Sequence, residues 1–266
     1  MATGLAKFPT QDVLGIPLAA VTMGETLDLV DDAIARRQPM RIGVVNAAKI
    51  VNMRRDSLLG EDVLSSDIIL ADGMAVVWAS RAVGRPLPER VAGIDLMHGM
   101  LERGNRLGYG VYCLGATDEV LDKTIAQINK DYPGVRVVGR ANGYFSGADE
   151  PRIAAAIAAA GADILLVAMT SPKKENFLGK WGKDLNVTVC HGVGGSFDVM
   201  AGKVQRAPEL WQRLGLEWLY RVKQEPGRLW RRYLVTNTLF VAAVVREMLR
   251  PTVRQTAGAP AGAARR

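Results

Sequence analysis

The stretch Ile68-Ile69-Leu70-Ala71-Asp72-Gly73 consists of four apolar residues stopped by a polar pair, and a helix is predicted to follow at residues 74–83. The same succession of apolar strand, turn and helix recurs along the chain. The predicted strands are residues 13–20, 40–45, 68–71, 109–114, 135–139, 164–168 and 187–190; the predicted helices are residues 22–37, 47–55, 74–83, 95–107, 117–132, 151–160 and 174–185. Strands that are apolar almost throughout and alternate with helices indicate an α/β fold, with a mostly parallel sheet covered by helices on both faces.

Ligands of such sheets bind beyond the carboxyl ends of the strands. That edge is predicted to gather Asn46, Asp72, Gly115, residues 171–175 and the turn at residues 191–196 around one crevice. Asp72 has two interpretations there: a general base, which needs an exposed carboxylate between apolar walls, or an N-cap for the helix that follows. Asn46 likewise either bonds a sugar hydroxyl or amide, or caps its own helix.

A second informative stretch, residues 190–232, begins with the glycine-rich turn Gly192-Val193-Gly194-Gly195. Gly194 and Gly195 are candidate substrate-binding positions, because glycines let a backbone wrap closely around an anion. The alternative is that they only permit a tight turn. The full G-x-G-x-x-G pattern of dinucleotide-binding proteins is absent, so the turn is a weak nucleotide motif.

The same stretch carries arginines at spacings of seven and three, namely Arg221, Arg228 and Arg231. Pro226 suits the first turn of a new helix, which would place Arg228, Arg231 and Arg232 on one face. Such a cluster can donate charge-assisted, bidentate hydrogen bonds to a diphosphate. The alternative is a basic helix that faces solvent or lipid.

Charge is distributed unevenly along the 266 residues. The net charge is +7, but residues 203–266 hold 13 Lys and Arg against 4 Asp and Glu, a balance of +9, whereas residues 1–202 have a balance of −2. Three of the five tryptophans, Trp211, Trp218 and Trp230, lie in the basic part. Aromatic residues interleaved with arginine favour a membrane interface over nucleic acid. The chain is therefore divided into an α/β core at residues 1–202, a helical membrane-associating appendage at residues 203–252 and a disordered tail at residues 253–266.

The remaining composition restricts the class of protein. Hydrophobic residues make up 48% of the chain, enough for one sizeable core, and residues 1–12 lack the apolar run of a signal peptide. The longest apolar run near the C-terminus is too short to span a bilayer. Cys113 and Cys190 each lie in a predicted strand and are expected to be buried free thiols. We therefore expect a cytoplasmic protein, without a metal site, that lies on the inner face of the cell membrane.

Several blocks together resemble the WecG/TagA/CpsF glycosyltransferase family, in the family's order and over about residues 12–250. The blocks are Asn46-Ala47, Ala71-Asp72-Gly73, Glu89-Arg90-Val91-Ala92-Gly93-Ile94-Asp95, Gly139-Arg140-Ala141-Asn142-Gly143-Tyr144-Phe145, Pro172-Lys173-Lys174-Glu175, Gly192-Val193-Gly194-Gly195-Ser196-Phe197-Asp198, Gly202-Lys203-Val204-Gln205-Arg206-Ala207-Pro208 and Gly215-Leu216-Glu217-Trp218-Leu219-Tyr220-Arg221. The resemblance implies a Rossmann-like core and an enzyme, inverting and metal-independent with no cofactor, that transfers a sugar from a UDP-sugar to a polyprenyl-diphosphate-linked saccharide during synthesis of a surface polysaccharide.

The resemblance also implies roles for individual residues. Asp72 matches the family's catalytic base, and Asn46 and Arg90 match residues that line the same pocket. Arg221, Arg228 and Arg231 match appendage arginines that hold the donor diphosphate.

Two positions depart from the family pattern. Val44 stands where some members have threonine, and Lys174, a candidate substrate-binding residue, replaces the glutamine of the usual Pro-Lys-Gln-Glu. Both alter polar contacts, so the donated sugar and the acceptor saccharide stay open.

Two other functions are weighed against the transferase. One is an NAD-dependent oxidoreductase on a similar sheet, which the incomplete glycine pattern disfavours. The other is a nonenzymatic, membrane-associated nucleotide-binding protein, for which the basic, aromatic C-terminal part would suffice. Away from the membrane, the exposed apolar surface of the appendage would favour self-association, so a homo-oligomer is also predicted.

Overall fold

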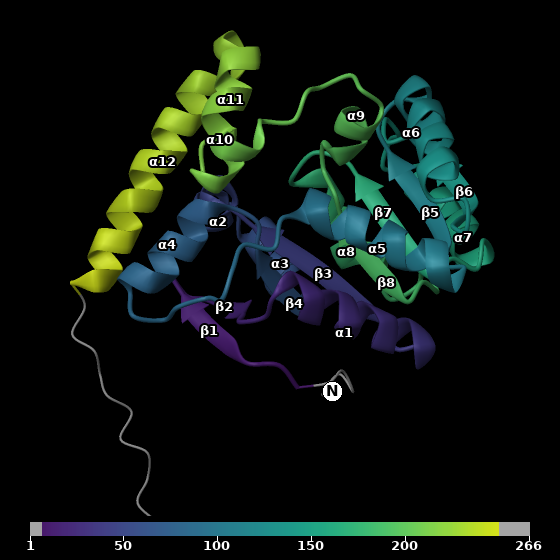
Figure 1. Ribbon diagram of the computed structural model, residues 1–266, viewed down its shortest axis with the longest axis horizontal. Coiled ribbons are helices and arrows are strands. Elements are labelled where there is room, and N and C mark those ends of the chain that lie inside the picture. Colours follow the sequence, from purple (N-terminus) through teal and green to yellow (C-terminus); the bar gives the residue numbers. More distant parts are fainter. Residues whose placement is uncertain (1–6, 250–266) are drawn as a thin grey trace, which may run out of the picture.

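The computed structural model describes residues 7–249, except the side chain of Arg228, so the predicted tail at residues 253–266 lies outside the described part. Its centre is a six-stranded sheet in the order β4-β3-β8-β7-β5-β6, and every neighbouring pair is parallel (Figure 1). The strands are β3 (Met40–Val45), β4 (Ile68–Ala71), β5 (Gly110–Gly115), β6 (Arg136–Ala141), β7 (Ile164–Ala168) and β8 (Val189–Gly192). The predicted parallel sheet is confirmed.

Helices cover both faces of the sheet because the side chains of each strand alternate between them. In β5, Cys113 points into one apolar cluster, whereas Tyr112 and Leu114 point into another on the opposite face. The first face is covered by α1 (Met23–Ala35), α5 (Gly93–Leu107), α6 (Asp118–Asp131) and the short α9 (Ser196–Met200); the second by α2 (Ala47–Met53), α3 (Ser57–Leu64), α4 (Met74–Ala82), α7 (Glu150–Ala159) and α8 (Lys173–Trp181).

The N-terminal region differs from the single strand predicted at residues 13–20. It forms an antiparallel hairpin of β1 (Thr10–Val13) and β2 (Ile16–Ala19). The turn between them places Leu14 and Gly15 at φ values of 60° and 83°. Two successive left-handed residues reverse the chain within two positions, and a non-glycine residue in this conformation is not foreseen from sequence.

Helix boundaries largely follow the predicted ones. The capping box of α1 is present, with Thr22 and Glu25 each accepting the other's backbone amide, and Thr117 caps α6. The helix predicted at residues 47–55 ends at Met53, and α3 follows it unpredicted, with the Asp56 side chain accepting the Leu59 amide as its N-cap. The short helix α9 was not predicted either.

The C-terminal part is helical, as predicted. It consists of α10 (Glu209–Arg213), α11 (Glu217–Gln224) and α12 (Pro226–Met248), which begins at Pro226. Helix α12, the long yellow helix of Figure 1, runs beside α2 and α4 at one side of the core. Its Phe240 is only 4% exposed and joins the apolar cluster under α2 and α4. Between residues 7 and 249, none of the helices combines the length and apolar character needed to cross a bilayer.

Candidate active site

A cavity of about 480 Å³ lies between the core and the C-terminal helices. Its inner end is at the carboxyl edge of the sheet, where Asn46 follows β3 and Asp72 follows β4. One wall comes from α4 and the other from α11 and α12. The lining also includes four side chains that were not predicted as site residues, namely Trp78, Tyr233, Asn237 and Phe240. They belong to two helices far apart in the chain, so only the packing of α12 on the core brings them to one cavity.

Asp72 is held by the start of a helix other than the one that follows it. Its Oδ1 accepts a hydrogen bond of 2.7 Å from the backbone amide of Gly93, the first residue of α5. The N-cap of helix α4 is Gly73, and no side chain accepts a hydrogen bond from the first turn as a cap. Asp72 therefore does not serve as the N-cap of α4, which was the alternative interpretation. Its carboxylate is partly exposed and lines the cavity.

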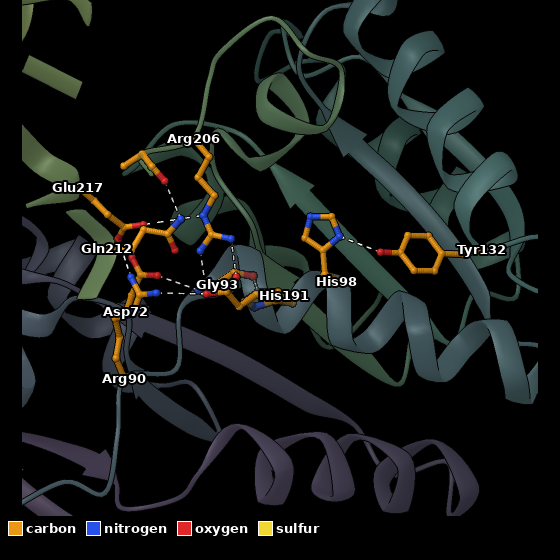
Figure 2. A network of polar contacts seen from close by, with 11 residues as sticks. Asp72, Arg90, Gly93, His98, Tyr132, His191, Arg206, Gln212 and Glu217 are labelled. Carbon is orange, nitrogen blue, oxygen red and sulfur yellow. Dashed lines mark hydrogen bonds and ion pairs between the residues drawn. The ribbon is translucent and has the colours of Figure 1, made fainter. Parts of the chain in front are cut away.

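His191 extends this hydrogen bonding on the other side of Gly93 (Figure 2). Its Nε2 lies 2.9 Å from the carbonyl oxygen of Gly93, and the side chain is fully buried. Because a carbonyl only accepts, Nε2 carries the proton and donates it. Burial lowers the pKa of His191 to about 4, so the ring is neutral at neutral pH. The backbone N–H and C=O of Gly93 thus join Asp72 to His191.

Asn46 caps its own helix, as one of its two interpretations predicted, and it also lines the cavity. Its Oδ1 accepts the backbone amide of Lys49 at 3.0 Å and caps α2. The side chain also lines the cavity, and no partner for its Nδ2 is found within the described residues. An amide donor therefore faces the same space as the Asp72 carboxylate.

Arg90 is engaged by two carboxylates at the boundary between core and appendage. Its Nη1 lies 2.6 Å from Glu217 of α11, and its Nη2 lies 3.3 Å from Asp95 of α5. Asp95 also accepts two hydrogen bonds from Arg206, at 2.6 and 2.8 Å. The four side chains form a network with no net charge (Figure 2). Glu217 itself lines the cavity, whereas Arg90 lies behind it.

Lys174 lies in a buried cluster rather than in the wall of the cavity. Glu175 accepts a hydrogen bond of 2.8 Å from Lys49 and lies 3.0 Å from Lys174. Burial lowers the pKa of Lys174 to about 8. Burial by itself would raise the pKa of Glu175, but Lys49 and Lys174 outweigh it and lower the value. Val44 and Lys174 both line a separate space of about 20 Å³, so the two departures from the family pattern are neighbours.

The remaining predicted residues are dispersed. Arg221 is exposed on α11 and lines the cavity, whereas Arg231 is exposed on α12 and does not. The backbone of Arg228 belongs to α12, and its side chain lies outside the described part. Gly194, with a φ of 55°, and Gly195 form the turn between β8 and α9, away from this cavity.

The site residues that were not predicted differ in how far the sequence could have indicated them. Met74, Trp78 and Ala82 are spaced four apart and predict an apolar helix face. The turn that contains His191 was predicted to lie at the crevice, but its bond to Gly93 leaves no local sign, because the two residues are 98 positions apart. The same holds for the pair of Arg90 and Glu217, which are 127 positions apart.

A parallel α/β sheet with a carboxylate and an amide at its carboxyl edge defines the class of α/β proteins whose candidate ligand site lies beyond the strand ends. Within that class, residues 11–254 match the model of the glycosyl transferase WecG/TagA/CpsF family. The chain belongs to this family, and it is therefore a transferase rather than the oxidoreductase considered as an alternative.

A relative from Bacillus spizizenii agrees with the family assignment. This protein, N-acetylglucosaminyldiphosphoundecaprenol N-acetyl-beta-D-mannosaminyltransferase, is 40% identical over 187 residues, which are 70% of this chain and 71% of the relative.

Proposed function

We propose that the protein transfers a sugar from a UDP-sugar to a saccharide linked to a polyprenyl diphosphate, with inversion at the anomeric carbon and without a metal ion. The name of the Bacillus spizizenii relative supports this substrate class, since it describes transfer of an N-acetylmannosaminyl group to N-acetylglucosaminyl-diphosphoundecaprenol. UDP-N-acetylmannosamine is accordingly the first donor to test.

Asp72 is the general base of this proposal. The observation that carries it is the placement of this carboxylate, with the amide of Asn46, at the inner end of the cavity. The Gly93 amide fixes one carboxylate oxygen at 2.7 Å. In the proposed step the acceptor hydroxyl gives its proton to Asp72 and its oxygen bonds the anomeric carbon, while the bond to UDP breaks and UDP leaves with the electron pair.

Arginines supply the charge that the leaving diphosphate requires. Arg221 lines the cavity and is the best placed of the three predicted arginines, with Arg228 and Arg231 following on α12. Positive groups aimed at the developing charge stabilise a transition state in which a diphosphate leaves. Arg90, held by Glu217, supports this wall.

The appendage also supports binding to the inner face of the cell membrane. Its outward side carries large apolar residues, with Trp230 at 54% and Leu234 at 59% exposure, next to Arg231 and Arg232. Amphipathic helices of this composition lie in the membrane interface, where a lipid-linked acceptor is also found.

Asp72→Asn tests the assignment of the base. The amide retains an oxygen that can accept the Gly93 hydrogen bond, but it cannot take a proton, so transfer should fall by at least about 100-fold. UDP release is measured with N-acetylglucosaminyl-diphosphoundecaprenol as acceptor. The stabilisation of the fold by UDP should not change, and it is followed as a shift of the melting temperature.

Asp56→Asn is the matched control, because Asp56 caps α3 and asparagine caps equally well. It should transfer at the wild-type rate. Full activity of Asp72→Asn would remove Asp72 from the mechanism, and the absence of transfer by the wild type with any UDP-sugar would contradict the proposed function itself.

A further inference from the structure

The wall that α4 contributes to the cavity is apolar throughout. Met74, Ala75, Trp78, Ala79 and Ala82 line it, at spacings that place them on one side of the helix. From Met74 to Ala82 the helix advances by about 12 Å at its usual rise per residue. The cavity is therefore a trough that extends along α4, away from the carboxyl edge of the sheet.

The opposite wall changes character along α12. Tyr233 and Asn237 lie nearer the start of the helix, and beyond them the lining consists of Phe240, Val241 and the pair at residues 244–245. Polar side chains of the cavity thus gather at one end, with Asn46, Asp72, Glu217 and Arg221, whereas the indole N–H of Trp78 is the one side-chain polar group that the described residues offer at the other end. A sugar or nucleobase would leave most of its polar groups unpaired in that end.

Exposure shows that the apolar end is open. Trp78 is 48% exposed on α4, and Val241 and Val245 are 58% and 46% exposed on α12. Large apolar side chains on both walls of an open trough mark a binding surface rather than a core. Val241 and Val245 also adjoin the outward apolar residues of α12, so the trough opens toward the side that the proposed function places on the membrane.

We propose that this trough, lined by Trp78, Ala82, Val241 and Val245, binds the isoprenoid chain of the acceptor where it joins the diphosphate. The inference rests on the proposed function for the identity of the acceptor. A flexible hydrocarbon chain matches an elongated apolar trough, and the diphosphate and saccharide that it carries match the polar end, where Asp72 and Asn46 lie. The protein therefore recognises the lipid itself, in addition to the saccharide that it carries.

Binding of soluble prenyl diphosphates tests the inference without requiring transfer. Dimethylallyl, geranyl, farnesyl and geranylgeranyl diphosphate are titrated against the full chain by calorimetry, with inorganic diphosphate as the reference. Affinity should rise by at least about tenfold from dimethylallyl to geranylgeranyl diphosphate as successive apolar units are buried. Equal affinity for all four compounds would overturn the proposal.

Two pairs of variants locate the site. Ala82→Trp fills the apolar end of the trough and should remove most of the gain with chain length, whereas Ala242→Trp adds the same side chain to an exposed position of α12 outside the lining. Val241→Asn should likewise weaken binding of the longer compounds, and Val235→Asn, also exposed on α12, should not. Unchanged melting temperatures show that the variants are folded.

The outcomes separate the inference from the proposed function. If the gain with chain length survives both Ala82→Trp and Val241→Asn, the prenyl chain binds elsewhere and the inference is wrong. If the wild type gains affinity with chain length, these variants lose that gain, and no UDP-sugar supports transfer, the inference about the trough holds and the proposed function is wrong. If transfer occurs but chain length has no effect, only the inference fails.

Discussion

At the scale of single residues, a buried histidine outside the cavity lining is linked to the proposed base by hydrogen bonds. His191 holds the carbonyl of Gly93, and the amide of the same residue holds Asp72. Neither bond was predicted, because His191 and Gly93 are 98 positions apart. Asp72 and Asn46 were predicted, since each comes directly after an apolar strand and the carboxyl ends of parallel strands share one edge.

His191 makes the stability of the fold sensitive to acid. Burial lowers its pKa to about 4 in the folded chain, against about 6.5 when unfolded. Between these values the unfolded chain binds more protons, so the free energy of unfolding falls as the pH is lowered through this window, by about 3 kcal/mol in total. His191→Gln removes the titrating group and keeps a donor for the Gly93 carbonyl.

The difference between wild type and His191→Gln should therefore shrink as the pH is lowered from about 6.5 to about 4. Urea unfolding at a series of pH values measures it. Parallel curves for the two proteins would show that His191 does not titrate with folding.

At the scale of elements, one short helix connects the appendage to the core. Helix α11 lines the cavity with Trp218 and Arg221 and is tied to the core by the ion pair of Glu217 and Arg90. The sequence predicted a helical region at residues 203–252 but not the pair of Glu217 and Arg90, because charged residues leave no local sign of their partners. The arginine that the family pattern places in the pocket is thus held by the appendage.

Glu217→Gln tests this connection. The 2.6 Å ion pair becomes a neutral contact, so α11 should open more often and its amides at residues 217–224 should exchange hydrogen faster. Hydrogen exchange followed by mass spectrometry measures the change. Glu209→Gln is the control, because its pair with Arg213 at 3.5 Å is largely exposed and contributes little. Equal protection of α11 in all three proteins would show that the pair does not hold it.

At the scale of the whole molecule, the C-terminal helix α12 contributes a side chain to the apolar core. Phe240 is buried against the cluster that contains Val76, Ile50 and Ile69. The division between core and appendage at residue 202 was predicted from the change in charge along the chain, and it stays a prediction.

Phe240→Ala should accordingly lower the free energy of unfolding of the whole protein by about 3–5 kcal/mol, because it leaves a cavity in that cluster. Chemical denaturation measures the loss. Trp230→Ala, at a position 54% exposed on the same helix, should change it by less than about 0.5 kcal/mol. A small effect of Phe240→Ala would mean that α12 contributes little to the stability of the core.

What the sequence by itself determined is local. Apolar runs such as residues 164–168 specify strands, Thr22 with Glu25 specifies a helix start, and the strand ends bring Asn46 and Asp72 to one edge, because these patterns depend on neighbours within a few positions. Only the tertiary structure decided that Lys49 pairs with Glu175 in a buried cluster, that Arg90 meets α11, and that α4 and α12 enclose an apolar trough. These contacts depend on how distant segments pack, and packing is set by the shape and burial of whole elements rather than by any single pattern along the chain.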